Sequence, residues 1–83
     1  MTRRPRGVNH DYARIRESAD WAITAASRRL RSGESGRVTV ADVIERARDN
    51  FALEINDATA RAMLRERFTL RGGGFGLTTD AWD

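Results

Sequence analysis

Arginine side chains set among alanines between residues 56 and 67 are the groups in this chain best suited to recognising a ligand. Arg61 and Arg65 lie four positions apart, with Ala58 and Ala62 beside them. Residues three and four apart share one face of a helix, so no bulky side chain separates the two guanidinium groups. A guanidinium can make a bidentate contact with guanine O6 and N7. The pattern favours a face that fits a DNA major groove, although the same spacing is typical of an ordinary solvated helix.

The helix that positions these arginines has its own sequence signals. Ala60, Met63, Leu64 and Phe68 recur at the spacing of one apolar helical stripe. Asn56 stands where an N-cap is expected, because its side-chain oxygen can accept a hydrogen bond from an unpaired amide of the first turn. We therefore predict a helix over residues 56–67.

From Phe68 the apolar residues alternate, which is typical of strands. The sequence predicts strands over residues 68–71 and 75–79, joined by Gly72, Gly73 and Gly74. Glycines tolerate positive φ and place no side chain between the backbone and a ligand. They do not form a nucleotide-binding phosphate loop, since neither a Gly-Lys-Ser/Thr sequence nor a helix follows them.

Two elements precede this unit. A long amphipathic helix is predicted over residues 11–31, and Trp21 lies off its apolar stripe on the side of Arg14 and Arg28. We expect the C-terminus to cover Trp21, with Trp82 packed on this helix. The alternative is that Trp21 makes a protein-protein contact.

Residues 37–40 predict a short strand that pairs with the C-terminal hairpin as a third strand. Thr39 and Asp42 have the spacing of a capping box, with Asp in place of the usual Glu. They predict the start of a second helix that continues to Phe51.

All fifteen positive side chains are arginine, and their distribution is uneven. Residues 1–31 carry eight arginines against three acids, residues 32–55 carry three against five, and residues 61–71 carry four against one. This distribution suits a polyanionic partner, because basic side chains release counterions when they bind phosphates.

Residues 1–10 contain Arg3, Arg4 and Arg6 and no apolar period. We expect a flexible basic arm before a domain that covers residues 11–83. Such an arm reaches into a DNA minor groove or makes no specific contact.

Composition argues against other classes. The 83 residues form one domain whose core is too small to enclose a substrate cavity as well. Cysteine is absent, which excludes disulfides and cysteine metal sites. The single histidine, His10, lies in the arm, and no nucleophile and base are suitably spaced, so we expect no catalysis, cofactor or metal. No apolar run approaches the ~20 residues needed to cross a bilayer. We expect a cytoplasmic, nucleoid-associated protein.

The order helix, strand, helix, helix, strand, glycine loop, strand resembles a winged helix-turn-helix DNA-binding domain over residues 11–82. The resemblance rests on residues 38–44, 56–67 and 68–79. It implies an α+β fold of three helices with a three-stranded antiparallel sheet.

The resemblance also implies sites and a function. In such domains the third helix enters the major groove, which would place Thr59, Arg61, Ala62 and Arg65 at base edges. Arg67, Arg71 and the glycines of the wing, residues 71–75, would contact phosphates. The implied function is sequence-specific binding of double-stranded DNA in transcription regulation or recombination, with two or more copies on one site. The alternatives are a protein-protein interaction module without DNA binding and an RNA-binding domain.

Overall fold

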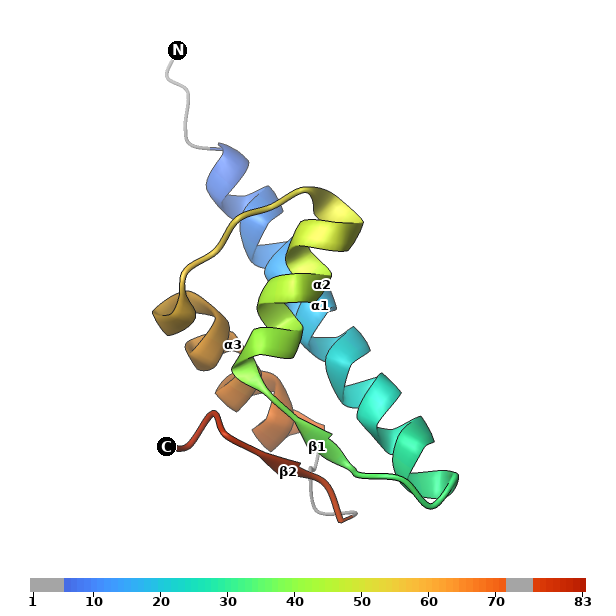
Figure 1. The fold of residues 1–83 in the computed structure, drawn as a ribbon. Coiled ribbons are helices and arrows are strands. Elements are labelled where there is room, and N and C mark those ends of the chain that lie inside the picture. Colours follow the sequence, from blue (N-terminus) through green and yellow to red (C-terminus); the bar gives the residue numbers. More distant parts are fainter. Residues whose placement is uncertain (1–5, 72–75) are drawn as a thin grey trace.

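The apolar stripes expected from the sequence form three helices, and the described residues also contain two short strands (Figure 1). The computed structural model describes residues 6–71 and 76–83, and for residues 6–10 it describes the backbone alone. The elements are α1 (Arg6–Arg31), β1 (Arg37–Val38), α2 (Val40–Phe51), α3 (Asp57–Leu70) and β2 (Thr78–Thr79). The result is a compact, mainly helical globule with a very small sheet.

The longest element, α1, buries most of the stripe that its sequence predicts, although Tyr12, the first residue of that stripe, is 45% exposed. The buried members include Ile15, Ala19, Ala22, Ile23 and Ala26. The helix begins at Arg6, earlier than the expected start at Asp11. It ends in a Schellman motif, in which the amide of Glu34 donates to the carbonyl of Arg29 at 2.8 Å. Gly33 makes this ending possible, because its φ of 84° is a left-handed conformation that favours glycine.

Both predicted N-caps are confirmed. The amide of Asp42 donates to Thr39 Oγ1 at 3.2 Å, and the amide of Thr39 donates to Asp42 Oδ2 at 2.9 Å. This reciprocal pair is the capping box of α2. At the start of α3, the amide of Thr59 donates to Asn56 Oδ1 at 2.8 Å. Each cap contributes about 1 kcal/mol to helix stability.

The predicted strand over residues 68–71 is wrong, because α3 continues to Leu70. Phe68 follows Leu64 by four positions and is buried on the same stripe. Extending the helix therefore keeps Phe68 in the core and satisfies the backbone without a partner strand. Leu70, which the alternating pattern placed beside Phe68, is instead 67% exposed.

The sheet also differs from the expected three-stranded antiparallel one. The described residues contain two strands, and β1 pairs with β2 in parallel, with Arg37 opposite Thr78 and Val38 opposite Thr79 (Figure 1). Both strands end beside the N-terminus of α2. The chain enters α2 directly from β1, whereas β2 delivers Asp80, whose Oδ1 accepts a hydrogen bond from the amide of Val40 at 2.8 Å. The glycine tip at residues 72–74 lies outside the described residues.

The segment that follows β2 is part of the core. Ala81 is fully buried, and so are Val38 from β1, Val43 from α2 and Leu64 from α3. All three helices pack against one another around these residues. Within the described ranges, none of the helices has the length and apolar character that crossing a bilayer requires.

Candidate nucleic-acid interface

Arg61 of α3 is half-buried and is held by hydrogen bonds to other parts of the chain. Its Nε and Nη2 both donate to Asp57 Oδ2, at 3.2 and 3.1 Å. Its Nη1 donates to the carbonyl of Asp80 at 2.7 Å and to that of Asp83 at 3.4 Å. One guanidinium therefore connects the first turn of α3 to the 80–83 segment.

Arg65, one turn further along α3, is attached to the same segment. Its Nε donates to the carbonyl of Ala81 at 2.7 Å, and its guanidinium carbon lies 5.8 Å from the centre of the Trp82 ring. The expectation that Trp82 packs on the first helix is wrong, because its ring lies beside Arg65 of α3. Trp82 remains 55% exposed. The two arginines expected at base edges thus both hold the end of the chain against α3.

Arg67 and Arg71, the expected phosphate contacts, both reach α1. Arg67 donates to both carboxylate oxygens of Asp20, with Nε 2.9 Å from Oδ1 and Nη2 3.3 Å from Oδ2. This hydrogen bond to Asp20 raises the pKa of the Arg67 guanidinium above its ordinary value. Arg71 caps the end of α3, lies 3.6 Å from Asp20 Oδ1 and donates to Thr24 Oγ1 at 3.1 Å.

The outward face of α3 is consequently small and apolar rather than basic. Ala58, Thr59 and Ala62 are exposed on it. A hollow of about 400 Å³ at this position is lined by Tyr12, Ala58, Thr59, Ala62, Met63 and Glu66. Tyr12 donates from its hydroxyl to Glu66 Oε2 at 2.8 Å, and this hydrogen bond raises the pKa of Tyr12.

Exposed arginines gather instead on the outward face of α1. Its residues follow one another at alternating spacings of three and four, on the side opposite the buried stripe. We define this α1 face as Arg14, Glu17, Trp21, Thr24, Arg28 and Arg31. It holds three arginines against one acid. Arg28 and Arg31 also lie in the last turn of α1, where positive charge stabilises the C-terminal end of a helix.

Two arginines from other elements border the α1 face. Arg46 of α2 places its guanidinium carbon 5.8 Å from the centre of the Trp21 ring, and Arg71 bonds Thr24. Trp21 is 44% exposed, and its expected cover by the C-terminus is replaced by this contact with Arg46. The tryptophan therefore lies among arginines rather than in the core.

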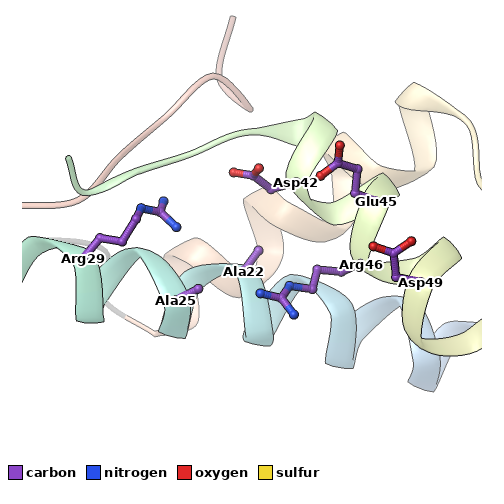
Figure 2. A pocket seen from close by; sticks show the side chains of 7 residues that line it. All are labelled: Ala22, Ala25, Arg29, Asp42, Glu45, Arg46 and Asp49. Atoms are coloured by element: carbon purple, nitrogen blue, oxygen red, sulfur yellow. The ribbon is translucent and has the colours of Figure 1, made fainter. Parts of the chain in front are cut away.

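A polar groove of about 250 Å³ lies on the surface between α1 and α2 (Figure 2). The figure shows Arg46 extending from α2 alongside α1 near Ala22, with Asp42, Glu45 and Asp49 on the α2 side. The three acids make the groove unsuitable for a polyanion, so the basic surface ends at Arg46. In the described part of the chain, no three side chains of His, Cys, Asp or Glu come together in a way that would hold a metal ion.

The remaining expected contacts belong to the N-terminal arm and the wing. Arg3, Arg4 and the glycines of the wing lie outside the described residues, and so does the side chain of Arg6. Sequence reasoning gave no role to Arg31, which belongs to the α1 face, or to Arg46, which borders it. The available signal was the outward spacing of Arg14, Trp21 and Arg28, which the sequence shows as clearly as it shows the buried stripe.

Comparison with known proteins adds no assignment. No protein-family model matches this chain, and neither a curated protein nor a solved structure matches it. The proposals below therefore rest on the residues and contacts described above.

Proposed function

We propose that this chain is a DNA-binding domain whose phosphate contacts are made by the α1 face. One observation carries the proposal: among the described residues, no carboxylate lies within ion-pair distance of Arg14, Arg28 or Arg31. Their charge is available to a ligand. Arginine binds phosphate through paired hydrogen bonds, and each phosphate it neutralises releases counterions.

The proposal keeps the DNA target expected from the sequence and moves the contact from α3 to α1. Base reading by α3 would require Arg61 and Arg65 to leave the carbonyl oxygens of the 80–83 segment. Abandoned hydrogen bonds of charged groups cost about 1.5–3 kcal/mol each. Phosphate contact by Arg14, Arg28 and Arg31 requires no such loss, so α1 is the better supported surface.

The order of α1, β1, α2, α3 and β2 supports a relation to the winged helix-turn-helix plan, whereas the parallel pairing of β1 with β2 does not. A role as a small transcription regulator or recombination factor belongs to this proposal. So does the binding of several copies to one site, because a face on one helix contacts only a few phosphates.

Fluorescence anisotropy with a labelled duplex across a salt series tests the proposal. The variant Arg14→Gln/Arg28→Gln/Arg31→Gln is compared with Arg16→Gln/Arg37→Gln/Arg48→Gln, which removes the same charge elsewhere. We expect the first variant to reduce the slope of log affinity against log salt by about 3, since each lost phosphate contact changes it by roughly 0.9. Equal losses in the two variants would show that only net charge matters.

A second candidate function is supported by the outward face of α3. Its small residues, Ala58 and Ala62, and the neighbouring hollow beside Tyr12 form a surface on which Arg61 pairs with Asp57 and Arg65 donates to the Ala81 carbonyl. Such a surface suits a protein partner better than a polyanion. If the wild-type chain binds no DNA at low salt in the same titration, the protein-protein interaction module becomes the better supported function.

A further inference from the structure

We propose that Trp21 is a stacking platform for an unpaired base, so that the α1 face binds single-stranded DNA in preference to an intact duplex. This inference rests on the proposed DNA-binding function and names the form of DNA that the same surface takes. Three features of the structure support it: the exposure and setting of Trp21, the spacing of the arginines, and the hollow beside the indole.

The indole is exposed but held in place. Trp21 is 44% exposed, and the Arg46 guanidinium lies 5.8 Å from its ring centre. A cation over an aromatic ring is attracted by the negative charge of the ring face. Arg46 therefore restrains the orientation of the indole while much of the ring stays in contact with solvent. Because the side chain is already restrained, it loses less conformational entropy when a base stacks on it.

A shallow hollow beside the indole offers room for a base. Its volume is about 220 Å³, and Trp21, Thr24 and Arg28 line it. Arg71 reaches the rim through its hydrogen bond to Thr24 Oγ1 at 3.1 Å. The hollow thus places an aromatic surface beside the guanidinium group of Arg28. This pair of groups is complementary to single-stranded DNA, in which each flat base is attached to a phosphate backbone.

The arginines continue this arrangement along the helix. Arg14 precedes Trp21 by seven positions and Arg28 follows it by seven, so all three project from one side of α1. At 1.5 Å per residue, each arginine lies ~10 Å from Trp21 along the axis. A strand lying along α1 can therefore place phosphates at both ends of the face and one base on the indole between them.

Duplex DNA cannot use the indole in this way. Its bases are stacked on one another and paired, so a tryptophan at the backbone would meet only sugars and phosphates. An unpaired base has a free π-face, and proteins that bind single strands combine basic grooves with aromatic side chains that stack on such faces. Trp21 therefore favours single-stranded DNA, whereas the arginines can bind the phosphates of either single-stranded or double-stranded DNA.

The test uses Trp21 as its own reporter. In a Trp82→Phe background, Trp21 is the sole tryptophan, and its fluorescence is followed during titration with a 15-nucleotide oligo-dT or a 15-base-pair duplex at equal salt. We expect quenching by oligo-dT and an affinity for it at least tenfold above that for the duplex. Trp21→Ala should lower the affinity for oligo-dT about tenfold and that for the duplex less than twofold. Trp21→Phe should retain most of the preference.

The outcomes separate two failures. Binding of both DNA forms with equal affinity, or equal losses for both in Trp21→Ala, overturns the stacking site and leaves the DNA-binding function standing. Failure to bind either form overturns both. A thermal melt checks that Trp21→Ala folds. Sedimentation velocity identifies the competing occupant: if Trp21→Ala converts a dimer to a monomer, the indole contacts a second copy and the stacking site is wrong.

Discussion

Helices α1 and α3 use the same residue type in opposite ways. Both helices carry arginines at helical spacing, and each lies beside a tryptophan that an arginine contacts, Trp21 with Arg46 and Trp82 with Arg65. On α3, Arg61 and Arg65 donate to carbonyl oxygens of the 80–83 segment. On α1, Arg14 and Arg28 have no carboxylate partner among the described residues. Whether an arginine is available to a ligand therefore depends on which hydrogen-bond acceptors the fold places beside it.

The difference has a structural cause. The 80–83 segment lies along α3 because Ala81 is buried in the core and Asp80 caps α2. Its backbone carbonyls consequently face α3, and Asp20 of α1 faces Arg67. The outward side of α1 has no chain segment across it among the described residues. The arginines of α3 therefore stabilise the fold, whereas Arg14, Arg28 and Arg31 of the α1 face remain available.

Removing two arginines from α1 in one variant and two from α3 in another gives the largest expected difference. We expect Arg14→Gln/Arg28→Gln to weaken DNA binding roughly tenfold at low salt, because two phosphate contacts are lost. Arg61→Gln/Arg65→Gln removes the same charge and should change affinity less than threefold while lowering the melting temperature. Anisotropy and thermal unfolding measure the two effects. A larger loss of affinity in the α3 variant than in the α1 variant would show that α3 makes the DNA contact.

Stability should show the opposite ranking. Arg67→Ala leaves the partly buried Asp20 without its main partner, and we expect a loss of about 1–2 kcal/mol in the free energy of unfolding. Arg14→Ala, on the exposed α1 face, should cost less than about 0.5 kcal/mol. Urea unfolding of both variants gives the comparison directly. Similar losses would mean that the Asp20 ion pair contributes nothing beyond surface charge.

Arg65 provides a finer test on α3. Arg65→Ala removes the bond to the Ala81 carbonyl and the contact with Trp82, and it should cost about 1 kcal/mol of stability. In a Trp21→Phe background, Trp82 fluorescence should then respond to urea before the rest of the molecule, because the 80–83 segment is held less firmly. Far-ultraviolet circular dichroism supplies the reference transition. Coincident transitions in this variant would argue that Ala81 and Asp80 hold the segment without Arg65.

The smallest expected effect concerns Tyr12, the single tyrosine of the chain. Its hydrogen bond to Glu66 raises the pKa of Tyr12 above the usual value of about 10. Because the folded pKa is the higher one, this contribution to stability is fully present below the unfolded pKa and is lost as pH rises through the folded pKa. Absorbance at alkaline pH follows the titration. Glu66→Gln should move the pKa of Tyr12 back towards 10, and an unchanged titration would show that the bond does not persist in solution.

Sequence reasoning was most successful where the signals are local. The three apolar stripes, the capping box of Thr39 and Asp42, and the Asn56 cap involve residues within about four positions, and they are confirmed apart from the exposed Tyr12. Phe68 shows where local signals become ambiguous, since it continues the stripe of α3 and also begins an alternating pattern. Helix continuation prevailed because it kept Phe68 buried without a partner strand.

The helices and their buried faces follow from helical periodicity, and the basic character of the chain follows from its arginines, so both can be predicted from the amino-acid sequence. The tertiary structure alone decided that β1 and β2 are parallel and that Trp82 lies beside Arg65. It also decided which arginines are engaged. The acceptors of Arg61, Arg65 and Arg67 are 4 to 47 positions away in the sequence, and most of them lie on other elements. Such partners are fixed by packing, so no local pattern separates an arginine that holds the fold together from one that faces a ligand.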